Sequence, residues 1–236
     1  MSDLLPGNNK FLNKNIILQE TKHCFFLKKI FSPQVTAGFT KTSLFGQLPA
    51  DFNVLRLYVG KKINFSHMVQ KHSRQIVLAE KPGVFISDGI FTKQKNHFLV
   101  VKTADCLPIF LTDNYSYVGV IHVGWKSAKK RILENIPFDL SESKVFAGPG
   151  LRSCCYQVGQ EFKQYPIFSG CLKKKKQNIF FDPIKFVKNA LILQGLKESN
   201  FFDSGLCSCC AKNNFFSYRR DKTDHRTLSF IGLKSS

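Results

Sequence analysis

The sequence predicts an α+β fold, a single-domain layered sheet sandwich with outer helices. Three observations predict it. Short apolar runs outnumber segments of helical period, turn-forming residues separate those runs, and 236 residues with 43% apolar side chains can enclose a large core. No internal repeat or long linker divides the chain. We therefore expect one domain over residues 1–236.

Eight short apolar runs are typical of strands, because turn signals bound them on both sides. They are Ile16–Leu18, Val54–Val59, Ile76–Leu78, Phe98–Val101, Ile109–Leu111, Val118–His122, Val145–Ala147 and Leu228–Leu233. Runs that follow one another closely favour hairpins.

Two segments have the period of a helix. The first follows Trp125 and ends before Pro137, and its apolar face is Ala128, Ile132 and Ile136. The second begins at Asp182-Pro183, an N-cap residue followed by proline at the first helical position. Its apolar face is Ile184, Val187 and Leu191.

The charge balance is strongly basic, with 35 Lys plus Arg against 16 Asp plus Glu and a net charge of +19. Such a surface can attract nucleic acid, anionic lipid or a phosphorylated small molecule. The lysines are scattered, however, and their enrichment alongside Phe, Asn and Ile is typical of AT-rich coding. The one dense run, Lys173–Lys176, is predicted to be a solvated loop.

The location we expect is cytoplasmic. No stretch approaches the roughly 18–20 apolar residues of a membrane helix, and residues 1–15 lack the apolar core of a signal peptide. Cysteines of a cytoplasmic protein are reduced, so we expect no structural disulfides. The eight cysteines are Cys24, Cys106, Cys154, Cys155, Cys171, Cys207, Cys209 and Cys210.

The segment from Thr103 to His122 is the most informative. Residues Asp113–Tyr115 are turn formers between two apolar runs, which predicts an antiparallel hairpin. A hairpin centred on Asn114 would place Cys106 opposite His122, with β-carbons about 4.5–5.5 Å apart. A change of one residue in loop length would shift this register.

A thiol and an imidazole so close have three interpretations. They are two ligands of a zinc ion, a Cys–His nucleophile pair, or unrelated neighbours. His72, just before the run Ile76–Leu78, is the third ligand that would favour zinc, because catalytic zinc sites keep three protein ligands and one open position. His67 is a closer competitor than the remaining histidines, whose surroundings are polar or loop-like: His23, His97 and His225.

Four segments look like successive signatures of one family: Thr103–Pro108, His122–Lys126, Gly148–Gly159 and Phe215–Asp221. They resemble the YfiH-like, laccase-domain family of purine nucleoside phosphorylases, formerly labelled multicopper polyphenol oxidases. Gln70–His72 and Asp88–Thr92 resemble two further family elements. The family-like body spans 54–233, and 1–53 is a divergent N-terminal part of the same domain.

The resemblance implies that His72, Cys106 and His122 are both the metal ligands and the catalytic residues, and that the fold is similar to the cytotoxic necrotising factor catalytic domain. It implies zinc as the cofactor, while the older label leaves copper open. It also implies phosphorolysis of adenosine, inosine, guanosine and methylthioadenosine, with adenosine deamination as a second activity. Purine nucleosides and phosphate are then the partners, and neither a membrane nor nucleic acid is expected.

Phosphate must be bound during phosphorolysis, and forked guanidinium groups suit it. Arg219 and Arg220 are the candidates, with ordinary salt bridging as the alternative. The family's N-terminal Gly-Phe-Ser-Thr-Arg element has the counterpart Gly38–Gly46 here, without arginine. Lys41 is the cation available to replace it, although a point charge loses the bidentate geometry.

The segment Cys207–Cys210 contains a C-x-x-C pattern, which Cys154 and Cys155 could complete as a four-thiolate zinc site. The resemblance gives no second metal there. We therefore expect reduced thiols without a metal.

Two other functions stay open. Some relatives are linked to editing of peptidoglycan precursors, which a zinc-dependent hydrolase would perform. A nucleic-acid-binding protein would use the net charge of +19, but no helix-turn-helix, RNA-binding aromatic signature or basic stripe supports it. Multicopper oxidase chemistry is set aside, because one His-Cys-His cluster cannot supply several copper sites.

Overall fold

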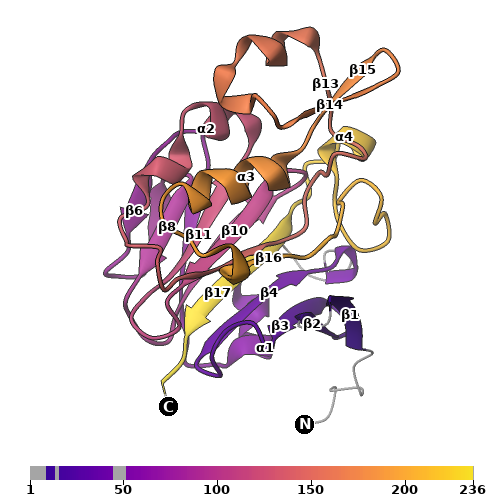
Figure 1. Ribbon diagram of the computed structural model, residues 1–236. Coiled ribbons are helices and arrows are strands. Elements are labelled where there is room, and N and C mark those ends of the chain that lie inside the picture. The colour runs from indigo at the N-terminus through magenta and orange to yellow at the C-terminus, as the bar shows by residue number, and fades with distance from the viewer. Residues whose placement is uncertain (1–8, 14–15, 45–51, 236) are drawn as a thin grey trace.

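The computed structural model describes residues 9–13, 16–44 and 52–235, and its architecture is the predicted sheet-rich α+β class (Figure 1). An eight-stranded sheet and a six-stranded sheet form the body, and a three-stranded sheet stands at one end of it. No helix in these ranges is long and apolar enough to span a bilayer.

The eight-stranded sheet joins both ends of the chain. Strand β5 pairs in parallel with β7 and β9, whereas the other neighbours are antiparallel. In spatial order its strands are β1 (Asn9–Asn13), β2 (Ile16–Glu20), β3 (Cys24–Lys28), β4 (Val35–Thr40), β17 (Thr227–Leu233), β9 (His97–Thr103), β5 (Asn64–Val69) and β7 (Val84–Ile86).

The six-stranded sheet carries most of the site described below. In spatial order its strands are β16 (Phe201–Asp203), β12 (Lys144–Ala147), β10 (Leu107–Thr112), β11 (Val118–Val123), β8 (Gly89–Thr92) and β6 (Ile76–Leu78). Every residue of β10 and β11 is buried, because both faces of the sheet are covered.

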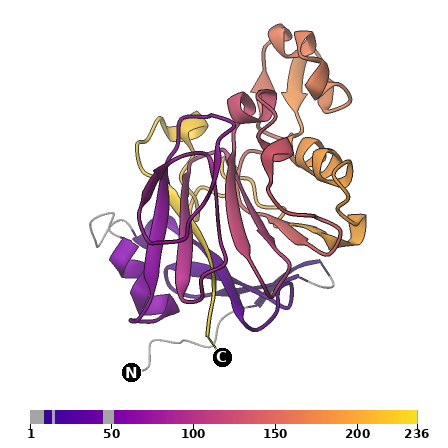
Figure 2. The ribbon, with the colours of Figure 1, turned by 90° about the vertical axis from the view of Figure 1, so that its left-hand side faces the viewer.

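Three apolar clusters define four layers. Between the sheets, Leu99 and Ile231 pack with Phe110 and Phe146. On the far side of the six-stranded sheet, strand residues pack with α2 (Trp125–Lys129) and α3 (Pro183–Ile192). On the far side of the eight-stranded sheet they pack with α1 (Arg56–Val59) and the 3-10 helix η2 (Phe52–Leu55). Figure 2 shows α1 and α3 on opposite sides of the sheets.

The start of α3 agrees with the prediction. Asp182 is the N-cap, its Oδ1 accepting a hydrogen bond from the Lys185 backbone N–H at 3.1 Å, and Pro183 occupies the first turn. This local signal is confirmed because it needs no distant partner.

The helix expected from Trp125 to Ile136 is interrupted. α2 ends at Lys129, Arg131 takes a left-handed backbone with φ 63°, and a short 3-10 helix, η3 (Ile132–Asn135), follows. Ala128 and Ile132 nevertheless both lie in the core. Their spacing in the sequence therefore predicted the burial of these side chains correctly, but the prediction of one continuous helix was wrong.

The strand predicted at 54–59 is wrong. The chain forms η2 and α1 there, because Leu55 and Val59 lie one helical turn apart and pack together against the outer face of the eight-stranded sheet. Gly60, with φ 122°, ends this helix.

The prediction of a solvated loop at Lys173–Lys176 is also wrong in part. These lysines are exposed, but Lys173 to Lys175 belong to β14 (Leu172–Lys175), which pairs with β15 (Asn178–Phe181) and, through it, β13 (Gln157–Val158). The apolar strand β15 supplies the partner, and Lys176 forms the turn with φ 54°.

The remaining short elements connect these layers. They are η1 (Thr42–Leu44), η4 (Gln160–Gln164), η5 (Pro166–Phe168), η6 (Glu198–Asn200) and α4 (Tyr218–Asp221).

Candidate functional site

Three predicted side chains meet beside the ends of β10 and β11. His72 follows β5, Cys106 directly precedes β10, and His122 lies in β11. One ligand atom from each lies within 4.8 Å of the others, and Cys106 Sγ is 3.7 Å from His72 Nε2. The His72 and His122 ring centroids are 4.8 Å apart. Three separate segments therefore place one thiol and two imidazoles around a common point.

The hairpin that brings two of them together is confirmed, but its register is not the predicted one. β10 and β11 are antiparallel, with Pro108 opposite His122 instead of Cys106. The turn is longer than expected, because Asp113 Oδ1 accepts backbone N–H groups from Tyr115, Ser116 and Tyr117. A shift of two residues keeps Cys106 on the face of His122, since side chains alternate with period two.

Asp88 organises the other half of the site. Its buried carboxylate accepts hydrogen bonds from the backbone N–H groups of Lys71, His72 and Ser73 at 3.2, 3.0 and 2.6 Å. It also accepts from Ser73 Oγ at 2.8 Å and from His122 Nδ1 at 2.8 Å. Asp88 thus holds the turn in which His72 has φ 51° and, by binding Nδ1, turns His122 Nε2 toward the cluster.

The charge of Asp88 is maintained by these partners. Burial would raise the pKa of its carboxyl, but the hydrogen bonds from His122 and Ser73 outweigh burial and hold that pKa far below its usual value. The carboxylate then keeps a proton on His122 Nδ1 whether the ring is neutral or charged, because a carboxylate can only accept from Nδ1–H.

Cys106 and His122 form a strongly coupled pair. Burial would raise the pKa of the Cys106 thiol, but the His122 and His72 rings lower it to about 6. Burial would lower the pKa of His122, but the Cys106 thiolate and Asp88 raise it to about 9. Both shifts favour a thiolate beside an imidazolium when no cation is bound, and a metal ion would displace the imidazolium proton.

Gly124 leaves the space that these side chains occupy. A β-carbon at this position would lie 2.8 Å from Cys106 Sγ and 2.8 Å from His72 Cδ2. The backbone there is extended, with φ −93°, so contact with the site, and not backbone conformation, is what requires glycine.

The donor set fits a metal ion. One thiolate and two imidazoles suit zinc, the second histidine is oriented by a carboxylate, and three protein ligands leave a fourth position open. Imidazole also suits copper, so the ligands alone do not separate the two metals.

Arg219 is held next to this cluster by the residue before Cys106. Its backbone N–H donates to Asp105 Oδ2 at 2.6 Å, and its Nη1 donates to the Gln157 carbonyl at 2.7 Å. The guanidinium carbon lies 5.6 Å from the Tyr156 ring centroid, and the side chain is exposed. Arg219 therefore lies near the segment that carries Cys106, with an exposed side chain.

Arg220 has a different position. Its Nη1 donates to the Ser208 and Cys209 carbonyls at 2.8 and 2.9 Å, and its Nη2 donates to the Phe215 carbonyl at 3.0 Å. It also forms an ion pair with Asp221. These hydrogen bonds mean that Arg220 stabilises the loop before α4.

Lys41 lies at the end of β4, where its Nζ pairs with Glu20 Oε1 at 2.7 Å and packs over the Phe25 ring. None of the contacts recorded for Lys41 within the described ranges reaches the His72, Cys106 and His122 cluster.

Two of the other histidines, His67 and His97, lie in strands and do not belong to the cluster of His72, Cys106 and His122. His97 is a strand residue, not the loop residue that its sequence context indicated, and its Nε2 lies 2.7 Å from Ser66 Oγ in the core. His67 lies in β5.

Sequence reasoning missed Asp88, Asp105 and Gly124 as site residues. Asp105 has φ 95° and accepts from Ser208 Oγ at 2.8 Å as well as from Arg219. All three lie in or beside the quoted segments. Asp105 is adjacent to Cys106 and Gly124 lies two residues after His122, so proximity to a ligand was the available signal for both. For Asp88 the available signal was an acidic residue directly before the apolar run Gly89–Thr92.

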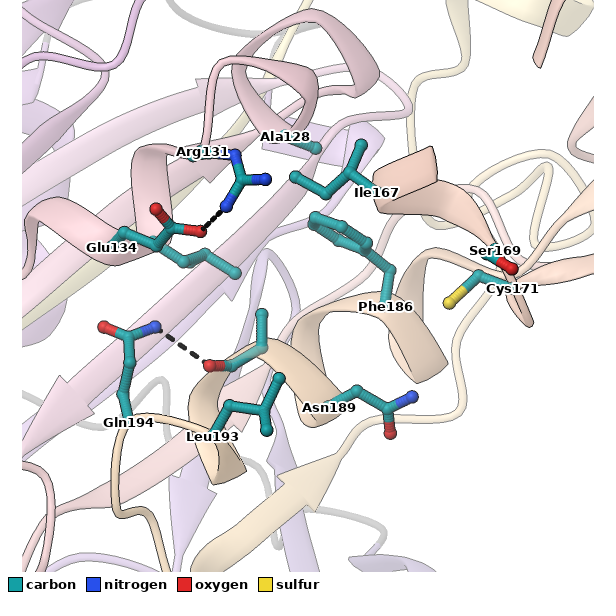
Figure 3. A pocket seen from close by; sticks show the side chains of 12 residues that line it. Ala128, Arg131, Glu134, Ile167, Ser169, Cys171, Phe186, Asn189, Leu193 and Gln194 are labelled. Atoms are coloured by element: carbon teal, nitrogen blue, oxygen red, sulfur yellow. Dashed lines mark hydrogen bonds and ion pairs between the residues drawn. The ribbon is translucent and has the colours of Figure 1, made fainter. Parts of the chain in front are cut away.

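A cavity of about 500 Å³ lies between η3 and α3, away from this cluster (Figure 3). Its lining includes Phe186, Leu193 and the ion pair of Arg131 with Glu134. None of His72, Cys106 and His122 lines it.

Comparisons with known proteins identify the family to which this sequence is similar. The family model described as "Multi-copper polyphenol oxidoreductase laccase" matches residues 52–234. A purine nucleoside phosphorylase of Aquifex aeolicus is 33% identical over 170 residues, which is 69% of this chain and 80% of that protein. One of Campylobacter jejuni is 30% identical over 218 residues, covering 82% of this chain and 93% of its own length.

Solved structures share the fold. YlmD from Geobacillus stearothermophilus superposes with a TM-score of 0.79 at 22% identity, covering 92% of this chain and 99% of that one. Bacillus licheniformis YfiH gives a TM-score of 0.75 at 23% identity, covering 96% of this chain and 99% of that one.

Proposed function

The chain belongs to the family described as multi-copper polyphenol oxidoreductase laccase, and from this membership we propose that it is a zinc-dependent purine nucleoside phosphorylase. The convergence of His72, Cys106 and His122 is the observation that carries the proposal. The relatives named purine nucleoside phosphorylase support the reaction class, at 33% and 30% identity.

Each residue then has a role. His72, Cys106 and His122 hold the metal, and Asp88 orients His122 through Nδ1 and fixes the turn of His72. Arg219 binds the phosphate, because an exposed guanidinium beside the cluster can form charge-assisted hydrogen bonds with it. A zinc ion held there supplies a Lewis acid toward a substrate oxygen or a water molecule.

Zinc is preferred to copper for a chemical reason. The reaction is a group transfer without electron transfer, and zinc has no redox chemistry. Multicopper oxidation normally needs several copper sites, and within the described ranges only one cluster contains histidine.

Adenosine deamination is proposed as a second activity of the same site. Water would replace phosphate as the nucleophile, and its attack would be on C6 of adenine instead of C1′ of ribose. The open ligand position that suits one reaction also suits the other.

One experiment tests both activities. The purified protein is incubated with adenosine, with and without phosphate, and the products are separated by chromatography. Adenine and ribose 1-phosphate formed only with phosphate support phosphorolysis, and inosine formed without phosphate supports deamination. Absence of all these products with zinc-loaded protein would refute the proposed function.

Matched variants connect the activity to the metal. His72→Ala, Cys106→Ala and His122→Ala should each lose bound zinc and both activities in parallel. Full activity in a zinc-free preparation would instead favour Cys106 as a nucleophile with His122 as its base.

A further inference from the structure

A second cluster of metal-binding side chains lies outside the site described above. Cys154 and Cys155 follow β12, and Cys207 and Cys210 follow β16. Their four sulfur atoms all lie within 4.8 Å of one another. Cys210 Sγ is 3.7 Å from Cys154 Sγ and 3.3 Å from Cys155 Sγ. Two loops far apart in the sequence therefore bring four thiols to one point.

The two sulfur–sulfur distances of 3.7 and 3.3 Å are close to the edge of a zinc tetrahedron. Zn–S bonds of about 2.3 Å put neighbouring sulfurs about 3.8 Å apart in a tetrahedral site. A disulfide would need about 2.05 Å between two sulfurs, and the structure forms none among the eight cysteines. The C-x-x-C spacing of Cys207 and Cys210 is typical of half of a structural zinc site.

The cluster holds four thiol groups that can each become a thiolate ligand, and their sulfur atoms all lie within 4.8 Å of one another. Four thiolates this close repel one another unless a cation lies between them. Because Cys154 and Cys210 are exposed, an ion can reach the cluster from solvent.

Arg152 provides an independent observation. Its side chain is buried, and Nη2 donates to the Gly148 carbonyl, Asp203 Oδ1 and Ser204 Oγ at 2.8, 2.8 and 2.9 Å. Its Nε and Nη1 are buried with no hydrogen-bond partner in the described part of the chain. Cys207 and Cys154 are close enough for their thiolates to act on this guanidinium. Four thiolates around Zn²⁺ leave two negative charges, which a buried guanidinium offsets in part.

The geometry points to a second, structural zinc ion held by Cys154, Cys155, Cys207 and Cys210. The site is closed, because four protein ligands fill the tetrahedron. This assignment replaces the sequence-based expectation that these thiols bind no metal. It does not depend on the proposed activity.

The ion would join the two loops that support the candidate active site. Ser208 Oγ donates a hydrogen bond to Oδ1 of Asp105, the residue before Cys106, at 2.8 Å. The Ser208 backbone N–H donates to the Gly150 carbonyl at 3.1 Å. Arg220 bonds to the carbonyls of Ser208 and Cys209 at 2.8 and 2.9 Å. The second zinc therefore stabilises the scaffold of Asp105 and Arg219 without touching a substrate.

Zinc content of purified, zinc-loaded protein under reducing conditions tests the proposal. The wild-type protein should hold two zinc ions per chain, and Cys106→Ala should hold one. Cys207→Ser in the Cys106→Ala background should hold none. The matched control is Cys209→Ser in the same background, which changes a cysteine of the same loop outside the four and should keep one zinc.

A second measurement needs no change to the four cysteines. Cobalt(II) added to metal-free Cys106→Ala protein should give one equivalent of tetrahedral absorption with intense sulfur-to-cobalt charge transfer. Bound zinc should at the same time protect Cys154, Cys155, Cys207 and Cys210 from alkylation, as mapped by mass spectrometry.

Three outcomes would overturn the assignment. Cys106→Ala could lose all zinc and give no thiolate–cobalt spectrum, the Cys207→Ser double variant could keep its zinc, or two of the four thiols could be found as a disulfide in the freshly purified protein. None of these results depends on phosphorolysis, so failure here is distinguishable from failure of the proposed function.

Discussion

His122 donates its Nδ1–H to Asp88 Oδ1 at 2.8 Å, and both side chains are almost completely removed from solvent. The same carboxylate accepts the backbone N–H of His72. One buried acid therefore positions two of the three candidate ligands, which come from segments 50 residues apart in the chain. The metal affinity of the cluster should depend on Asp88 although Asp88 is not itself a ligand.

Asp88→Asn should lower zinc affinity at the His72, Cys106 and His122 site by roughly 10–100-fold, as loss of an outer-shell partner of a ligating histidine does. The amide cannot accept all the bonds that the carboxylate accepts, because one of its two positions is a donor. Competition with a chromophoric chelator measures the affinity. Asp224→Asn, at an exposed position, is the control and should leave the affinity unchanged.

Gly124→Ala should abolish metal binding at this site without unfolding the sheets. Its methyl group would lie 2.8 Å from both Cys106 Sγ and His72 Cδ2, so one ligand must move. Gly83→Ala is the matched control, because its β-carbon would meet only Phe85 ring atoms, at 3.7 Å and beyond. Equal zinc content in the two variants, with circular dichroism unchanged, would contradict the steric argument.

Cys106 in metal-free protein should react with iodoacetamide as a low-pKa thiol. The thiolate is the reactive form, so the rate should be low below pH 6, rise through the pKa of about 6 and level off above it. In His122→Ala the rise should shift to higher pH, because the imidazolium that stabilises the thiolate is gone. Peptide mapping isolates Cys106 from Cys154, whose pKa burial raises to about 11. An alkylation rate of Cys106 that rises near pH 9 in both proteins would contradict the prediction.

Arg219→Ala should affect catalysis, whereas Arg220→Ala should affect the stability of the fold. Loss of Arg219 should reduce kcat/KM for phosphate by roughly 10–100-fold, since a hydrogen bond to a charged group contributes about 1.5–3 kcal/mol. Its melting temperature should change little, because the side chain is exposed.

Loss of Arg220 should instead lower stability by about 1–3 kcal/mol, because the carbonyls of Ser208, Cys209 and Phe215 lose their donor. Thermal unfolding and steady-state kinetics of both variants measure the two effects. A phosphate defect confined to Arg220→Ala would reverse the assignment.

Local patterns determined much of this fold. Asp182-Pro183 starts α3, and the apolar runs on either side of Asp113–Tyr115 form the β10–β11 hairpin, because capping, turn chemistry and periodicity act within a few residues. The same locality explains the errors. The apolar run that contains Leu55 and Val59 forms a helix because these two side chains pack against the outer face of a sheet, which the run itself does not show. The turn after β10 is longer than its spacing predicted, because the Asp113 side chain accepts backbone N–H groups within it, and its centre lies one residue later.

The candidate site divides in the same way. The sequence by itself placed Cys106 and His122 on one face of a hairpin and proposed His72 as a third ligand, and the resemblance to a known family implied the same three residues. Only the tertiary structure distinguished Arg219 from its neighbour Arg220, gave Asp88 its five hydrogen bonds, and brought Cys155 to Cys210. Those relationships join segments tens of residues apart. Their geometry is fixed by how the two sheets pack and pair, which no local spacing encodes.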